Sequence, residues 1–197
     1  MRIITVGREF GSGGRELGKR LADELSMNYY DREILTALAG KLKMDESYIS
    51  EKVDRGLLSA IPVSFGRTFS YRQQDTVKIL AEQQNIIREI AKRGEDFVIV
   101  GRNADVILAQ YHPFRIFVYA DMESKLNRCK EREELEDLAK RIRQVDKGRA
   151  KNRELLSGSI WGRKENYDLC VNTSGVVIKE IVPLIAEYAD LRFKGER

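Results

Sequence analysis

The sequence has few of the residues that stabilise small secreted domains, bind structural metals or cross membranes. Its 197 residues include only two cysteines, three prolines, one histidine and one tryptophan. Cys129 and Cys170 lie far apart, so they form neither a disulfide framework nor a zinc-binding pair, and we expect both to be reduced packing residues. No apolar stretch approaches the roughly 20 residues of a membrane-spanning helix. The first strand runs straight into a glycine loop, so we expect a cytoplasmic protein with no membrane association.

The sequence also lacks a strong charge of one sign, because 35 Lys and Arg side chains are nearly balanced by 31 Asp and Glu side chains. A hydrophobic content of 42% beside 34% charged residues is typical of a globular protein, and a length of 197 residues favours one domain. Basic residues nevertheless cluster between residues 128 and 164, where they would face phosphates or RNA. RNA binding stays an alternative, although the chain has no zinc spacing, basic heptad region or RNP-type aromatic stretch.

Short apolar runs alternate with segments of helical periodicity along the chain. The runs that we expect to be strands are residues 3–6, 28–31, 97–101, 114–119 and 169–171. Apolar residues three or four apart predict helices over residues 16–25, 32–41, 45–53, 75–92, 123–156 and 177–191. This alternation predicts an α/β fold with a parallel sheet. Residues 56–72 contain glycine, proline and several hydroxyl residues, which indicates a long loop of the kind that often has a function.

A glycine-rich segment, GREFGSGGR over residues 7–15, lies between the first expected strand and the first expected helix. Glycines let the backbone approach an anion closely, and the amide groups at a helix N-terminus carry partial positive charge. The segment therefore predicts a phosphate-binding loop. The residues that we expect to contact a nucleotide are Gly11, Ser12, Gly13, Gly14, Arg15 and Glu16.

The loop departs from the phosphate-binding pattern G-x-x-x-x-G-K-[ST], in which a lysine reaches the outer phosphates. The best superposition places Arg8 at the first glycine, Gly14 at the lysine and Arg15 at the hydroxyl residue. Arg15 is therefore expected to supply the missing positive charge, although its planar guanidinium differs from an ammonium group. Two other interpretations remain open. One is a dinucleotide fingerprint G-x-G-x-x-G, in which Glu16 would replace the third glycine, and the other is a glycine turn without a ligand.

The chain resembles the cytidylate-kinase-like branch of the nucleoside monophosphate kinases, whose members often begin with a similar REFGSGG loop. Beyond the loop, the supporting segments are YYDREI over residues 29–34, VIVGRNAD over 98–105, FVYA over 117–120, DKGRA over 146–150 and YDLCVNT over 167–173. The resemblance implies one three-layer α/β domain of the P-loop NTPase type over residues 1–197, with a parallel sheet between two layers of helices. It also implies a monophosphate-binding insert near residues 31–75 and a lid near residues 135–165.

The same resemblance implies an activity and its participants. A member of this family would transfer the γ-phosphoryl group of ATP, with Mg²⁺, to a nucleoside monophosphate such as CMP or dCMP, or to a related small phosphate-bearing acceptor. Arg102 is similar to the arginine that grips the acceptor phosphate, and Asp31 to a carboxylate that orients the acceptor. Glu16 would act through the metal ion. Asp31 as a helix N-cap and Arg102 as a surface ion pair are the structural alternatives.

Arginines of the lid-like stretch would close over the transferring phosphoryl group, whose charge must be neutralised. Asp146 and Arg149 match the spacing of an Asp and an Arg in cytidylate-kinase lids, so Arg149 is the preferred residue. Arg143 fits only with a shift of one residue, and Arg67 in the expected loop is a weaker candidate for an acceptor contact. The expected catalytic residues are Arg15, Asp31, Arg102 and Arg149, and the expected acceptor-binding residues are Asp31, Arg67, Arg102, Arg143, Asp146 and Arg149.

Two positions depart from typical cytidylate kinases, which have a lysine in the loop and an Asp before the Gly-Arg pair. In this sequence the corresponding residues are Gly14 and Val100. Both changes remove groups that act on phosphate and metal. A protein that binds a nucleotide without turning it over is therefore a further alternative.

Overall fold

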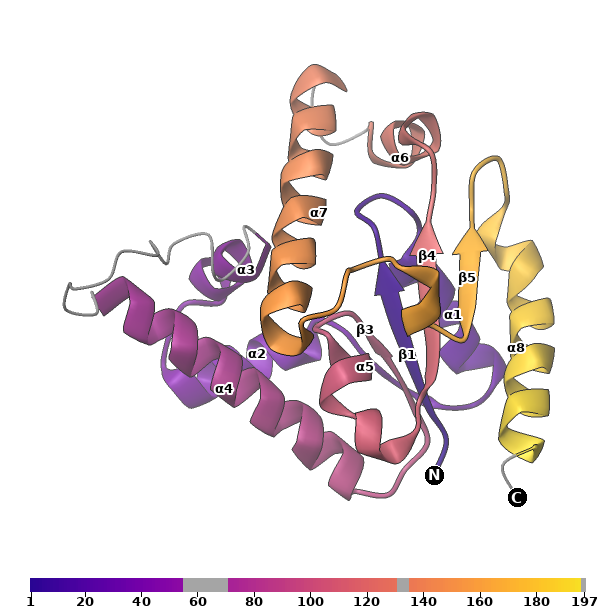
Figure 1. The fold of residues 1–197 in the computed structure, drawn as a ribbon, viewed down its shortest axis with the longest axis horizontal. Helices are drawn as coiled ribbons and strands as arrows, with labels where there is room; N and C mark the ends of the chain where they lie inside the picture. The colour runs from indigo at the N-terminus through magenta and orange to yellow at the C-terminus, as the bar shows by residue number, and fades with distance from the viewer. Residues whose placement is uncertain (55–70, 131–134, 196–197) are drawn as a thin grey trace.

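The computed structural model describes residues 1–54, 71–130 and 135–195, and within them a parallel sheet lies at the centre (Figure 1). The strand order is β2-β3-β1-β4-β5. The strands are β1 (Ile3–Arg8), β2 (Asn28–Tyr30), β3 (Phe97–Val100), β4 (Phe114–Tyr119) and β5 (Leu169–Asn172). The predicted parallel α/β architecture is confirmed.

The helices alternate with the strands along the chain. They are α1 (Gly14–Glu24), α2 (Glu33–Leu42), α3 (Glu46–Asp54), α4 (Tyr71–Lys92), α5 (Ala104–Ile107), α6 (Met122–Cys129), α7 (Leu135–Ser157) and α8 (Ile178–Lys194), with short 3₁₀ turns η1 (Ala109–Tyr111) and η2 (Lys164–Asn166). Within the described part of the chain, no helix has the length and apolar character needed to cross a membrane.

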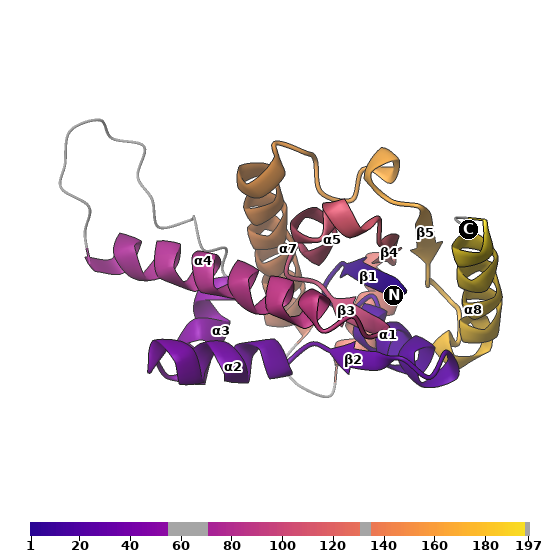
Figure 2. The same cartoon turned by 90° about the horizontal axis from the view of Figure 1, so that it is seen from below.

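Helices cover both faces of the sheet, so the protein has two apolar layers (Figure 2). In β1, the side chains of Ile4 and Val6 pack against α1 and α8, whereas Ile3 packs on the opposite face with α2, α4 and α5. This division follows from the alternation of side chains along a strand. On α1, Leu17 and Leu21 are fully buried. Burial of one such side chain contributes about 1.5–3 kcal/mol to the stability of the fold. The two apolar layers therefore give the glycine loop a rigid support.

The carboxyl ends of the central strands meet at one edge of the sheet. Val6 of β1 lies beside Val100 of β3 and Ile116 of β4, so the segments that follow these strands start side by side. Figure 1 shows α7 standing beside this edge, next to the loop that joins β1 to α1. In open α/β sheets, ligands bind at the carboxyl ends of the strands. The fold therefore indicates that a ligand site lies at this edge of the sheet.

Several expected boundaries differ from the structure by a few residues, and three differences affect the interpretation. The charged stretch 123–156 contains two helices, α6 and α7, rather than one. β1 extends to Arg8 because its pairing with β4 continues as far as Val118. Helix α4 begins at Tyr71, so Arg72 belongs to a helix rather than to the expected loop. The rest of that loop, including the candidate Arg67, lies outside the described residues.

Candidate functional site

The glycine loop turns sharply into α1 through left-handed backbone conformations. Gly11 has φ +75° and Gly13, the N-cap of α1, has φ +80°. A Cβ atom at Gly13 would lie 2.0 Å from Ile178 Cδ1, so only glycine fits this turn. The first helical hydrogen bond runs from Leu17 N to Gly13 O at 2.9 Å. The amides of the residues between them have no acceptor within the helix, which makes the turn suitable for an anion.

A cavity of about 640 Å³ opens in front of this turn, and we call it the loop cavity. It is lined by Arg8, Glu9, Phe10, Gly11, Gly13, Gly14, Arg15, Glu16, Lys19, Tyr29, Asp31, Arg32, Glu33, Arg128, Cys129 and Arg149. The structure therefore brings together all the expected nucleotide-binding residues except Ser12. The Ser12 hydroxyl is buried and donates to Glu9 O at 2.9 Å, so this side chain supports the loop from beneath.

Asp31 is the buried carboxylate of the loop cavity, with a residue exposure of 2%. Its Oδ2 atom lies 2.5 Å from Arg15 Nε, and its Oδ1 atom lies 3.8 Å from Arg8 Nη2. The N-cap of α2 is Arg32, so the interpretation of Asp31 as a helix cap does not hold. Burial, followed by the negative charge of Asp31, raises the pKa of Tyr29 to about 12, so the phenol stays protonated at neutral pH.

The donor set of the loop cavity is consistent with a Mg²⁺ ion held mainly by phosphates. Among the described residues, no three His, Cys, Asp or Glu side chains cluster as a complete metal site. Mg²⁺ commonly uses only one or two carboxylates beside phosphate and water ligands. Asp31 Oδ1 is buried in the cavity wall without a hydrogen-bond partner, so this oxygen fits such a role. Glu16 pairs with Arg20 at 2.8 Å on the exposed side of α1.

Helix α7 is bound directly to the glycine loop. Phe10 N donates to Asp146 Oδ1 at 2.7 Å, and an Arg149 guanidinium N–H donates to Arg8 O at 3.0 Å. The buried ammonium of Lys125 lies 2.7 Å from Glu9 Oε2 and 3.3 Å from Asp146 Oδ2. Two of the three expected residues of this helix, Asp146 and Arg149, therefore reach the loop.

Not every expected residue of α7 reaches the site. Arg143 is exposed and lines neither the loop cavity nor the smaller cavity described below. Its expected acceptor contact stays a prediction.

Asp146 should make the stability of the protein depend on pH. Burial raises the pKa of this carboxyl above its ordinary value of 3.8, although Phe10 N–H, Arg149 and Lys125 oppose the change. Between these two pKa values the native state holds more protons than the unfolded state, so the free energy of unfolding falls as pH rises. We expect the free energy of unfolding of the wild type, relative to that of Asp146→Asn, to decrease as pH rises from about 4. Urea unfolding of both proteins at a series of pH values measures this difference. A difference independent of pH would contradict this assignment.

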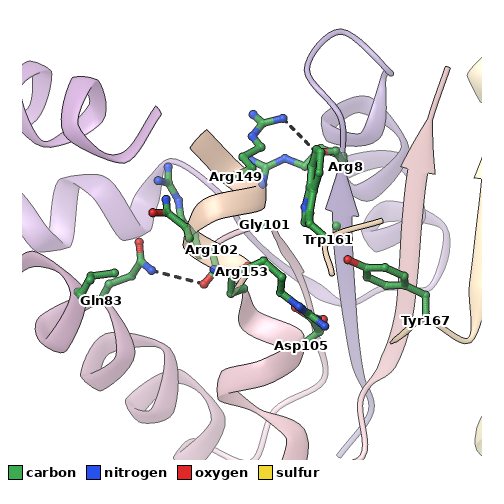
Figure 3. A pocket seen from close by; sticks show the side chains of 13 residues that line it. Arg8, Gln83, Gly101, Arg102, Asp105, Arg149, Arg153, Trp161 and Tyr167 are labelled. Atoms are coloured by element: carbon green, nitrogen blue, oxygen red, sulfur yellow. Dashed lines mark hydrogen bonds and ion pairs between the residues drawn. The ribbon is translucent and has the colours of Figure 1, made fainter. Parts of the chain in front are cut away.

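A second, smaller cavity of about 60 Å³ is also lined by Arg8 (Figure 3), and we call it the arginine cavity. Its lining includes Arg102, whose carbonyl oxygen accepts a hydrogen bond from Gln83 Nε2 at 3.4 Å. Gly101, Arg102 and Asn103 have φ values of +76°, +60° and +52°. Consecutive left-handed residues are costly for side chains other than glycine, and such strain is concentrated at functional sites.

The far wall of the arginine cavity is built by a buried ion pair and an aromatic contact. Arg153 of α7 pairs with Asp105, and both side chains are almost fully buried. Trp161 packs edge-on against Phe117, with ring centroids 5.3 Å apart and planes at 90°. Glu9 and Asp105 are thus used in ion pairs, with Lys125 and Arg153 respectively.

Arg8 is the functional candidate that the sequence analysis did not select. Arg8 and Arg149 line both cavities, and Figure 3 shows their side chains next to each other. The signal was present in the superposition of the loop on G-x-x-x-x-G-K-[ST], where Arg8 occupies the position of the first glycine. What the pattern does not show is the direction of the Arg8 side chain.

Solved structures with the same fold include several kinases. An uncharacterized protein from Eubacterium ventriosum aligns with a TM-score of 0.70 and 27% identity, covering 96% of this chain and 99% of that chain. Shikimate kinase from Bacteroides thetaiotaomicron aligns with a TM-score of 0.59 and 14% identity, covering 96% and 98%. Thymidylate kinase from Candida albicans aligns with a TM-score of 0.52 and 13% identity, covering 97% and 92%. These similarities confirm the predicted P-loop kinase fold.

Comparison of the sequence itself gives the family. None of the curated proteins that were compared matches the sequence significantly. The sequence pattern of the cytidylate kinase-like family matches residues 3–175, which include the glycine loop, both cavities and the Asp146–Arg149 pair. The chain therefore belongs to the cytidylate kinase-like family.

Proposed function

We propose that this protein transfers the γ-phosphoryl group of ATP to a nucleoside monophosphate, such as CMP or dCMP, or to a related small phosphate-bearing acceptor. The observation that carries the proposal is the loop cavity. First-turn amides of α1, five arginines and the buried carboxylate of Asp31 converge there at the carboxyl end of a P-loop kinase sheet. Positive charge and amide donors in a concave site favour a polyphosphate.

Several of the lining residues have a role in this proposal. The amides of Gly13 and Gly14 and the guanidinium of Arg15 bind the donor phosphates. Arg149 neutralises the charge on the phosphoryl group in transit, because it lines both cavities. When bound, Mg²⁺ supplies further neutralisation of the phosphate charge, with Asp31 and, through water, Glu16 as its protein partners.

The acceptor is proposed to present its phosphate to the arginine cavity. Arg102 lines that cavity and has the planar group that binds phosphate in a bidentate manner. The cavity of about 60 Å³ is far smaller than a nucleotide, so the nucleoside would extend toward the proposed monophosphate-binding insert of residues 31–75. Asp31 orients the acceptor, which as a phosphate monoester needs no strong base. Residues 135–165 are proposed as the lid.

The proposal is tested by ADP release in a coupled assay with a panel of nucleoside monophosphates and small phosphorylatable metabolites. Turnover that depends on the acceptor is the expected result, and its absence at micromolar enzyme would remove the kinase assignment. Calorimetry then separates the alternatives. ATP binding without turnover would indicate a nucleotide-binding protein, whereas RNA affinity that falls steeply with salt would indicate an RNA-binding protein.

Arg149→Ala is expected to lower kcat by about 10²–10³-fold, the usual effect of removing one group that stabilises transition-state charge. Lys151→Ala is the matched control, because Lys151 is an exposed cation of the same helix. Steady-state kinetics and thermal unfolding should be measured for both variants. Equal kcat values for Arg149→Ala and Lys151→Ala would contradict the role of Arg149.

A further inference from the structure

The side chain of Arg8 occupies space beside two glycines that are distant in the sequence. A Cβ atom at Gly14 would lie 2.5 Å from Arg8 Cβ and 3.0 Å from Arg8 Cγ. A Cβ atom at Gly101 would lie 1.3 Å from Arg8 Nη1. The Arg8 side chain therefore starts against the first turn of α1 and ends over the residue that follows β3. It is 12% exposed, so it lies within the site rather than on the surface.

This packing gives a physical meaning to the altered motif. In the pattern G-x-x-x-x-G-K-[ST], a glycine stands at the first position and a lysine at the seventh. In this chain Arg8 stands at the first position and Gly14 at the seventh. Because Arg8 fills the space next to Gly14, a lysine at position 14 has no room for its Cβ atom. The two departures from the pattern are therefore complementary, because the long cationic side chain stands at position 8, at the start of the loop, rather than at position 14, at its end.

We propose that Arg8 is the cation that binds the outer phosphates of the donor nucleotide, in place of the motif lysine. This inference rests on the proposed function. Arg8 lines both the loop cavity, proposed for the donor phosphates, and the arginine cavity, proposed for the acceptor phosphate, so its guanidinium can contact the outer phosphates that face the acceptor. Its guanidinium is always charged and matches two phosphate oxygens at once. Arg15 remains a separate contact at the outer side, since its side chain is 51% exposed.

The surroundings of Arg8 hold its guanidinium in this position. Its Nη2 atom lies 3.8 Å from Asp31 Oδ1, which is too far for a hydrogen bond but close enough for attraction. Arg15 is the nearer partner of Asp31, at 2.5 Å, so the carboxylate keeps a partner when Arg8 turns toward a phosphate. The Arg8 carbonyl accepts a hydrogen bond from Arg149, which fixes the backbone from which the side chain extends.

The test is calorimetric titration of the full chain with ATP, ADP and AMP. Arg8→Ala is expected to weaken ATP and ADP binding about 10- to 100-fold, the effect of losing hydrogen bonds to a charged group, with little change for AMP. Arg8→Lys should retain part of the affinity. Arg88→Ala should bind as the wild type does, because Arg88 is exposed on α4, bonds to Gln84 and lines neither cavity. If Arg8→Ala fails to fold, Arg8→Met removes the charge and keeps most of the volume.

The outcomes separate this proposal from the one on which it rests. A wild type that binds none of the three nucleotides would overturn both proposals. A wild type that binds ATP, with Arg8→Ala or Arg8→Met binding it equally well, would overturn the role of Arg8 alone. An equal loss for ATP, ADP and AMP would also overturn it, because a phosphate contact must discriminate among them. Unchanged ATP binding by Arg8→Ala, together with a raised KM for the acceptor, would likewise overturn the role of Arg8.

Discussion

Arg8→Gly combined with Gly14→Lys is expected to bind ATP about tenfold more tightly than either single variant, a difference of about 1.4 kcal/mol in binding free energy. Arg8→Gly alone loses the cation of the site. Gly14→Lys alone places a Cβ atom 2.5 Å from Arg8 Cβ, so the start of α1 is displaced. Together the two changes restore the spacing of glycine and lysine in the phosphate-binding pattern. Isothermal titration of the wild type, the two single variants and the double variant with ATP measures the coupling.

Gly14→Ala separates the steric part of this effect from the charge. It should destabilise the wild type, because the added methyl group would lie 2.5 Å from Arg8 Cβ and 3.0 Å from Arg8 Cγ. In the Arg8→Gly background the same change should be tolerated, since Gly14 is a helical residue without a positive φ. Additive losses of affinity in the Arg8→Gly/Gly14→Lys cycle would show that the two positions do not share one space.

Arg153→Leu is expected to destabilise the protein by about 3–5 kcal/mol, because it leaves the carboxylate of Asp105 buried without its partner. The side chains of Arg153 and Asp105 are 6% and 9% exposed, so water cannot replace the lost pairing. For a chain of this size the melting temperature should fall by about 6–20 °C. Urea and thermal unfolding, followed by circular dichroism, measure the loss.

The double variant Arg153→Leu/Asp105→Leu should recover much of this stability, because two apolar side chains can replace a buried ion pair. Lys19→Ala is the exposed control. Its pair with Asp23 lies on the surface of α1, with side-chain exposures of 56% and 61%, and should scarcely affect the unfolding midpoint. If Arg153→Leu were no less stable than Lys19→Ala, the pair would contribute little to holding α7 against α5.

The helices and strands were predicted from local sequence patterns, and most of these predictions agreed with the observed fold. Leu17 and Leu21 recur at helical spacing and are buried on α1, and the β-branched residues of β1 pair with two neighbouring strands. The glycine loop was recognised because Gly11 and Gly13 adopt left-handed backbone conformations, which glycine takes more readily than other residues and which are a local property of the chain. Asp31 and Arg149 were selected through the resemblance and do line the loop cavity.

Contacts between distant residues were not predictable in the same way. The bond from Phe10 to Asp146 joins positions 136 residues apart, and the pair of Arg153 with Asp105 joins positions 48 residues apart. The acidic residue Glu9 was one of several carboxylates in the loop region, and only its contact with the buried ammonium of Lys125 shows that it is a structural partner. Such pairings depend on which elements pack together and on the rotamers that this packing allows.

The sequence alone thus determined the order of strands and helices along the chain, the parallel sheet and the glycine-rich loop before the first helix, because hydrophobic periodicity and glycine act over a few residues. Only the tertiary structure decided where the side chain of Arg8 lies. Arg8 could have pointed to solvent or to the sheet, and its direction became evident from the space left by Gly14 and Gly101, which belong to different elements. The physical reason is that a long side chain takes its direction from the atoms that surround it, and those atoms come together only when the chain folds.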